Sequence, residues 1–189
     1  MSMGEGRPLR ADAQRNRAKI LEAAEVVFSA QGLSASTEDV AKEAGVGIGT
    51  VFRHFPAKES LIEAVFLARV RRLADKAAAL SQAQAGPAFF GFFTYAVEQA
   101  ATQSAYADVL SEAAAAGNGE EASVVGAELA ATVETLLTRA QQAGAVRADI
   151  GPAELIALLI GASRAAERVG ADVRLKALDI VFDGLRPVQ

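Results

Sequence analysis

The sequence contains no cysteine and a single histidine, His54, among 189 residues. Without cysteine the chain can form no disulfide, thiolate metal site or catalytic thiol, and one histidine cannot make a histidine cluster for a metal ion. It also contains no glycine-rich phosphate loop and no nucleophile motif. An all-helical enzyme using Glu98, Glu112 or Arg164 as acid or base is an alternative, but their spacing specifies no chemistry. We therefore predict no enzymatic activity, no metal and no cofactor.

Long apolar runs are absent as well. The longest, such as 155–162, are far shorter than the roughly 20 residues that a membrane-spanning helix needs. The polar N-terminus lacks the apolar segment of a signal peptide. Because 51% of the residues are hydrophobic, the chain has enough apolar surface to bury a core. These features predict a globular cytoplasmic protein with no membrane association.

The net charge of −4 is unevenly distributed. Residues 1–76 hold 12 Lys and Arg against 10 Asp and Glu, whereas residues 77–189 hold 7 against 13. Five cations lie close to the N-terminus: Arg7, Arg10, Arg15, Arg17 and Lys19. Such a cluster is suited to phosphate binding, and it is equally typical of a solvated or disordered arm.

Apolar residues three and four apart recur along the whole chain, without a sustained alternating pattern. This predicts an all-α fold of roughly nine helices. Besides a short helix after Ser36, we expect helices at about 13–31, 48–54, 58–80, 87–104, 105–116, 121–143, 152–169 and 171–185. Gly32 is expected to end the first helix in the left-handed conformation, and residues 81–86 are expected to form a loop.

Residues 36–55 carry the most informative pattern. Two short helices that cross at a tight turn need a small residue where they touch, a permissive residue in the turn and branched apolar residues beneath. These are supplied by Ala41, Gly45, Val46 and Val51. Ser36 is expected to cap the first helix with Asp39, and Phe55 to pack in the core. The exposed side of helix 48–54 would then fit a DNA major groove.

The segment from Ile20 to Leu61 resembles the DNA-binding domain of TetR-type transcriptional repressors. The matching motifs are Ile20-Leu21-x-Ala23-Ala24-x-x-x-Phe28-x-x-x-Gly32, Asp39-Val40-Ala41-x-x-Ala44-Gly45-Val46, Gly49-Thr50-Val51-Phe52-x-His54-Phe55 and Lys58-Glu59-x-Leu61. The resemblance implies a helix-turn-helix DNA-binding domain in residues 1–57 and a C-terminal effector-binding and dimerisation domain in residues 58–189. The end of the chain is similar to the SbtR-like branch of the family.

The candidate DNA-binding residues follow from this resemblance and from the exposed side of helix 48–54. They are Ser36, Thr37, Gly47, Ile48, Gly49, Thr50, Phe52, Arg53, His54 and Lys58. The resemblance implies phosphate contacts for Thr37 and Lys58. Arg53 is the first candidate for a guanine edge.

The chain departs from the family at two places in this motif. The family often has a polar pair where this chain has Gly47 and Ile48, and a tyrosine where it has Phe52. Ile48 suits a thymine methyl group, whereas Phe52 cannot donate to a phosphate. The glycines at 47 and 49 either lie at a frayed helix end or permit close approach to phosphate. A histidine such as His54, taken alone, is more often a packing or solvated residue, but the surrounding motif favours a DNA contact.

In this family the C-terminal helices bind a small-molecule effector, here of unknown identity. Four phenylalanines lie within five positions of the segment 89–93, which places aromatic surface on more than one side of a helix. The candidate pocket residues are Phe66, Val70, Phe89, Phe93, Tyr106 and Leu110. An ordinary aromatic core is the alternative.

The last two helices are expected to form a two-fold four-helix dimer interface. The candidate interface residues are Leu155, Leu158, Leu159, Ala162, Ala166, Leu175, Leu178 and Phe182. A hairpin packed on its own chain is the alternative. Together these features predict a homodimeric repressor that is released from a roughly palindromic double-stranded operator by its effector. An effector-independent regulator and an activator are the competing functions.

Overall fold

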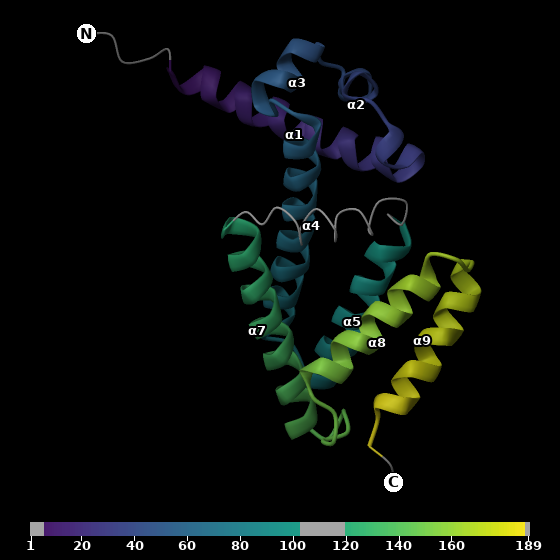
Figure 1. The fold of residues 1–189 in the computed structure, drawn as a ribbon. Helices are drawn as coiled ribbons and strands as arrows, with labels where there is room; N and C mark the ends of the chain where they lie inside the picture. The colour runs from purple at the N-terminus through teal and green to yellow at the C-terminus, as the bar shows by residue number, and fades with distance from the viewer. Residues whose placement is uncertain (1–5, 103–119, 188–189) are drawn as a thin grey trace. The chain divides into compact units, whose positions relative to one another are not determined.

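The computed structural model describes residues 6–102 and 120–187, and these ranges are helical without a β-strand (Figure 1). The eight described α-helices are α1 (Gly6–Gln31), α2 (Thr37–Ala44), α3 (Ile48–His54), α4 (Lys58–Leu80), α5 (Ala85–Thr102), α7 (Glu120–Gln142), α8 (Pro152–Ala166) and α9 (Ala171–Leu185). The all-α prediction is confirmed. None of the described helices is both long and apolar enough to cross a membrane.

Most helices begin and end where the sequence predicts, and two begin earlier. Helix α1 starts at Gly6 rather than near residue 13. The prediction missed its first turns because they lack the apolar stripe that marks a helix in a sequence. Helix α5 starts at Ala85, so the expected loop over 81–86 is partly wrong. Pro87 is its third residue, where an N–H has no partner within the helix. The expected helix at 105–116 lies outside the described residues.

The chain packs as two compact units, and the division falls inside α4, after Phe66. The predicted domain boundary between residues 57 and 58 stays a prediction. In the first unit, α1, α2, α3 and the start of α4 enclose a small apolar core. Its fully buried side chains include Ile20, Phe28, Val40, Val51 and Leu61. Phe55 is also buried, which agrees with its expected packing role.

Two glycines with positive φ shape the first unit. Gly32 has φ +66°, which ends α1 in the left-handed conformation as predicted. Gly45 has φ +65° at the end of α2, and its N–H donates to the carbonyl oxygens of Ala41 and Lys42. The chain then reverses within a few residues to start α3. A side chain at either position would be strained, since L-residues rarely adopt this conformation.

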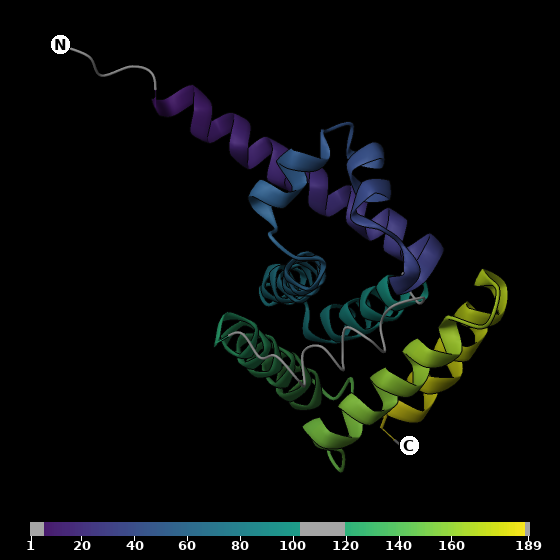
Figure 2. The same cartoon turned by 45° about the horizontal axis from the view of Figure 1, so that its top comes forward.

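The second unit contains α5, α7, α8 and α9 around a larger apolar core. Helices α8 and α9 run side by side, as both views show (Figure 1, Figure 2). Phe182 of α9 packs against Phe90 and Phe93 of α5, with ring centroids 4.8 and 5.6 Å apart. Aromatic contacts of this kind fasten the last helix to its own chain.

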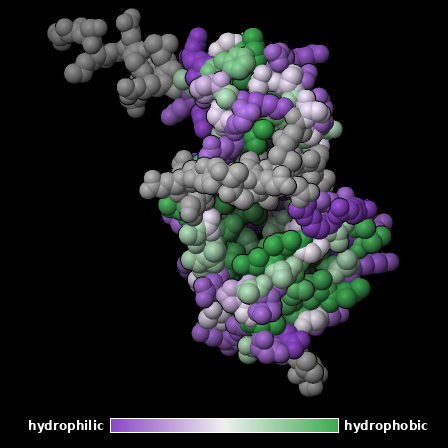
Figure 3. All heavy atoms as spheres, viewed as in Figure 1, coloured by the Kyte–Doolittle hydropathy of each residue, from purple (hydrophilic) through white to green (hydrophobic). Residues whose placement is uncertain are grey.

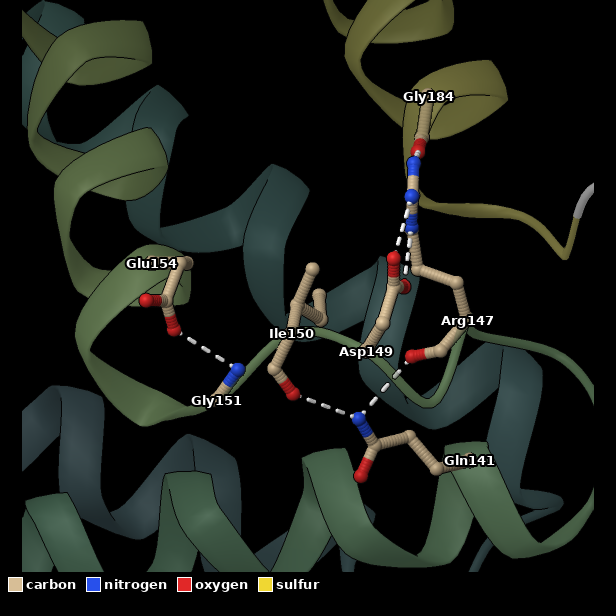
Figure 4. A network of polar contacts seen from close by, with 7 residues as sticks. All are labelled: Gln141, Arg147, Asp149, Ile150, Gly151, Glu154 and Gly184. Carbon is tan, nitrogen blue, oxygen red and sulfur yellow. Dashed lines mark hydrogen bonds and ion pairs between the residues drawn. The ribbon is translucent and has the colours of Figure 1, made fainter.

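A polar network fastens the turn between α7 and α8 (Figure 4). The Gln141 side chain donates to the carbonyl oxygens of Arg147, at 3.0 Å, and Ile150, at 2.9 Å. Arg147 makes a two-pronged contact with Asp149, at 2.5 and 2.6 Å, and its guanidinium also donates to the carbonyl oxygen of Gly184 in α9. These bonds satisfy backbone groups of a turn that has no regular secondary structure.

Candidate nucleic-acid interface

The start of α2 is held by a reciprocal cap. The Oγ atom of Ser36 accepts from the Asp39 N–H at 3.1 Å, while Asp39 Oδ2 accepts from the Ser36 N–H at 3.1 Å and from its hydroxyl at 2.7 Å. The Ser36 hydroxyl and then its N–H lower the pKa of the Asp39 carboxyl, and Lys42 acts in the same direction. The predicted cap is therefore present, and Thr37 is the first residue of the helix.

Helix α3 is anchored to the first unit by one side. Val51 is fully buried, and the Phe55 N–H donates to its carbonyl oxygen at 2.8 Å. Phe55 follows the helix into the core, and the guanidinium of Arg17 in α1 lies 5.1 Å from the centre of its ring. At the other end, Thr50 N–H donates to the Gly47 carbonyl oxygen at 2.8 Å. The helix is short, and Val51 and Phe55 fix it to the core.

The side of α3 opposite Val51 divides into three pairs of residues. Each step along an α-helix turns by about 100°, so residues four apart lie one above the other. The pairs are Gly49 and Arg53 at the centre, Ile48 and Phe52 on one flank, and Thr50 and His54 on the other. Burial agrees with this division, because the central pair is exposed and Thr50 and His54 are half-buried.

The flank formed by Ile48 and Phe52 is apolar yet lies at the surface. Ile48 is 36% exposed and Phe52 is 44% exposed. Large apolar side chains at the surface of so small a helix contribute little to the core beneath it. The side chains of Ile48 and Phe52 are therefore available to contact a binding partner.

The fold itself does not require the glycines at the start of α3. Gly47 precedes the helix in an extended conformation with φ −71°, and Gly49 lies within it. A Cβ atom built at either position would meet no other atom within 4 Å. Gly47 is the N-cap and Gly49 the second residue, so both lie at the start of the helix, and the open space around them also leaves room for close approach by a partner.

All ten candidate DNA-binding residues lie in the first unit, in the segments 36–37 and 47–58. Thr37 begins α2, and Lys58 begins α4, where it is half-buried. Gly47, Gly49 and Arg53 are exposed. The helix-turn-helix thus presents, on one compact unit, the residues that the sequence singles out.

The candidate pocket residues that the structure describes are divided between the two compact units. Phe89 and Phe93 are buried in the core of the second unit, beside a cavity with room for about one water molecule. Phe66 packs against the core of the first unit, and Val70 is half-buried in α4 within the second. The other two candidates, Tyr106 and Leu110, lie outside the described residues. The effector pocket stays a prediction.

The candidate interface residues of α8 and α9 separate into two groups. Leu155, Ala166 and Leu178 are buried in the core of their own chain, and Leu159, Ala162 and Phe182 are half-buried against it. Leu158 and Leu175 are exposed. For the six inward residues, the alternative of packing within the chain describes the structure better than surface contact does.

Large apolar residues of α8 and α9 lie at the surface, and sequence reasoning had singled out two of them, Leu158 and Leu175, but not the rest. Figure 3 shows hydrophobic side chains gathered over these two helices. They are Ile156, Leu158, Ile160, Val173, Leu175 and Ile180, of which Ile180 is 73% exposed. We call this set the α8–α9 apolar surface. The signal was present as a second stripe, since Ile156 and Ile160 are four residues apart, but it was masked by apolar residues on every side of α8.

A shallow groove of about 240 Å³ lies beside this surface, between α8, α9 and Val97 of α5. Small side chains line much of it, among them those of Ala162, Ala165 and Ala177. Grooves lined by small residues allow another helix to approach closely. On α8 and α9 the second unit therefore has both exposed apolar side chains and an apolar groove.

Two family profiles match this chain. Residues 20–65 match the profile described as bacterial regulatory proteins of the tetR family, and residues 84–187 match the C-terminal domain of SbtR-like transcriptional regulators. Among curated proteins, the chain is similar to the HTH-type transcriptional regulator UidR of Escherichia coli (strain K12), with 40% identity over 60 residues, 31% of each chain. The matched segment thus spans less than a third of the length of UidR.

Solved structures match over nearly the whole chain. A TetR transcription regulatory protein from Mycobacterium vanbaalenii is 39% identical with a TM-score of 0.72, covering 95% of this chain and 100% of that one. A TetR transcriptional regulator from Streptomyces coelicolor is 36% identical with a TM-score of 0.72, covering 92% and 99%. Both agree with the two profiles in fold and in kind of protein.

Proposed function

This chain belongs to the TetR family of transcriptional regulators, and on that premise we propose that it acts in the cytoplasm as a homodimeric repressor of a roughly palindromic operator. A small molecule that binds the C-terminal helices releases it from the DNA. The observation that carries the DNA-binding part is the outward side of α3, which is exposed although Val51 and Phe55 fix the other side of the helix to the core.

The outward side of α3 has the chemistry of a recognition helix. The major groove is about 12 Å wide and admits an α-helix. Arg53 lies at the centre of the exposed side, where its guanidinium suits the paired acceptors of a guanine. Thr50 and His54 supply hydrogen-bonding groups on one flank, where they would meet the sugar-phosphate backbone.

Two helix starts supply the proposed phosphate contacts. Thr37 begins α2 and Lys58 begins α4, and the first N–H groups of a helix lack partners within it. Glu38 and Asp39 add negative charge to the first turn of α2, which opposes an anion there. The Asp39 carboxylate accepts hydrogen bonds from Ser36 and cannot itself donate to an anion. We therefore assign the phosphate contact to the hydroxyl of Thr37.

Dimerisation is proposed through the α8–α9 apolar surface. Monomeric soluble proteins rarely expose contiguous apolar surface of this kind, and a two-fold axis pairs such a surface with itself. A dimer would present two copies of α3 to successive major grooves, about 34 to 36 Å apart. Each subunit would then bind one half of the palindrome.

The effector is proposed to be apolar and aromatic in character, since Phe89 and Phe93 lie in a core where the described residues bury no polar or charged side chain. The empty space beside these rings holds about one water molecule, so binding requires the side chains to move apart. An effector that binds the opened conformation more tightly shifts the population away from the form that binds DNA. An activator, or a regulator without an effector, would keep its operator in the presence of every such compound.

The proposal is tested by selecting bound duplexes from a random DNA pool with the full chain and with a Thr50→Ala/His54→Ala variant. Both side chains are half-buried and neither has a core role, so circular dichroism should show the variant folded. We expect an enriched palindrome with the natural chain and its loss with the variant. Enrichment that is the same in both would place the DNA contact elsewhere, and no enrichment would contradict the function.

A further inference from the structure

The exposed apolar flank of α3 is the feature that the proposed function has not used. Ile48 and Phe52 are four residues apart on one side of the helix, 36% and 44% exposed, and together they make a continuous apolar strip. Neither residue can donate or accept a hydrogen bond through its side chain. A polar base edge or a phosphate is therefore a poor match for this strip.

One group in the major groove is apolar, and it belongs to one base. The C5 methyl group of thymine projects into the groove, whereas the other edges there present hydrogen-bond donors and acceptors. Resting on the proposed DNA-binding function, we propose that Ile48 and Phe52 read thymine methyl groups in each half of the operator. The strip would select thymine at one or two positions beside the base contacted by Arg53.

The central position of α3 makes such contacts sterically feasible. Gly49 lies between the apolar flank and the outermost point of the helix, and a Cβ atom there would meet nothing in the chain. Without that Cβ, the backbone of α3 can approach the floor of the groove more closely. A closer approach brings the short Ile48 side chain within reach of a methyl group. The side chains on the opposite flank, Thr50 and His54, would then meet the groove wall.

Replacing thymine by uracil tests this directly, because it removes the methyl group and leaves base pairing unchanged. Each thymine of the selected operator is replaced in turn by deoxyuridine, symmetrically in both halves, and affinity is measured by fluorescence anisotropy at one salt concentration. We expect about fourfold weaker binding for each contacted methyl group, from the apolar area removed. Thymines outside the contacted positions should show no change.

Variants then assign the methyl contacts to their side chains. In Ile48→Ala and Phe52→Ala the penalty for uracil at the matching position should disappear, because the apolar partner is already missing. Thr50→Ala is the matched control on the opposite flank, and it should weaken binding to thymine and uracil duplexes by the same factor. Circular dichroism and thermal midpoints check that each variant is folded, which the surface exposure of Ile48 and Phe52 favours.

The outcomes separate this inference from the function on which it rests. If no duplex is enriched by the chain, the proposed function fails and this inference with it. If a duplex is enriched but no uracil substitution weakens binding, only the inference fails. A uracil penalty that persists in an Ile48→Ala/Phe52→Ala double variant would also overturn it, because the methyl group would then act through the shape of the DNA.

Discussion

Gly49 is a residue that the fold does not require, and we propose that it serves the contact with DNA. It is the second residue of α3, and within a helix glycine costs up to about 1 kcal/mol relative to alanine. Nothing in the chain occupies the space that a Cβ atom would fill. Gly45 is the contrasting case, since its φ of +65° makes glycine a structural requirement of the turn.

The variant Gly49→Ala should therefore fold more stably and bind DNA less well. We expect the free energy of unfolding to rise by up to about 1 kcal/mol, because alanine restricts the unfolded chain and favours the helix. The added methyl group would hold α3 away from the groove and lower operator affinity. Urea unfolding and anisotropy titration measure the two effects. A variant that keeps full affinity would show that the backbone of α3 does not approach DNA closely.

At the residue scale, the sequence predicted local structure correctly where a motif specified it. The cap of Ser36 and Asp39, the turn at Gly45 and the burial of Val51 and Phe55 all follow from spacing and residue type. The exposure of Phe52 agrees with its place among the candidate DNA-binding residues, which rested on the family resemblance; residue type alone would have placed this aromatic side chain in the core.

At the scale of elements, α2 depends on its N-terminal cap. The variant Ser36→Ala removes the oxygen that accepts from the Asp39 N–H and the hydroxyl that donates to its carboxylate. We expect a loss of about 1 kcal/mol in the free energy of unfolding at neutral pH. Urea unfolding followed by circular dichroism measures it. Ser34→Ala is the matched control, since Ser34 is exposed outside this cap and its hydroxyl donates to the carbonyl oxygen of Gln31.

The same cap predicts an acid sensitivity. Folding lowers the pKa of Asp39, chiefly through the Ser36 hydroxyl, so its charged form stabilises the folded state above the ordinary value of about 3.9. That stabilisation is lost as the pH falls through the lowered pKa. Unfolding measured between about pH 5 and pH 2 should show a smaller decline in Ser36→Ala than in the natural chain. Equal declines would mean that the Ser36 bonds do not control Asp39.

Element boundaries were predictable where an apolar stripe meets a glycine or proline. Helix α9 runs from Ala171 to Leu185 as expected, and α3 and α4 also match. The early starts of α1 and α5 were not predictable, because their first residues carry no apolar stripe of the kind that marks a helix in a sequence. The exposed residues Ile156 and Ile160 of α8 were missed for a related reason. α8 carries apolar residues on all sides, so the sequence cannot tell Leu155, which is buried, from Ile156, which is exposed.

At the scale of the whole molecule, the account requires that α8 and α9 join two chains. The variant Ile160→Lys places a charge in the proposed interface, where dimerisation would have to remove its water. We expect at least about tenfold weaker dimerisation, which corresponds to 1.4 kcal/mol. Operator affinity should fall with it. Sedimentation measures the change in mass.

A second variant controls for the added charge. Val26 on α1 is 57% exposed, the same fraction as Ile160, but it belongs to the first unit and not to the α8–α9 apolar surface. Val26→Lys should leave the dimer intact. Dimers of unchanged stability in both Ile160→Lys and Ile180→Lys would show that the chain associates through another surface or not at all.

The central claim is that a dimer places two copies of α3 in successive major grooves, and the spacing between operator halves tests it most directly. The affinity of the full chain is measured for the selected palindrome and for the same duplex with about five base pairs, half a helical turn, inserted at its centre. The account predicts that the insertion lowers the affinity to that of a single half-site, because the second groove then faces away. Equal affinity for the two duplexes would contradict it.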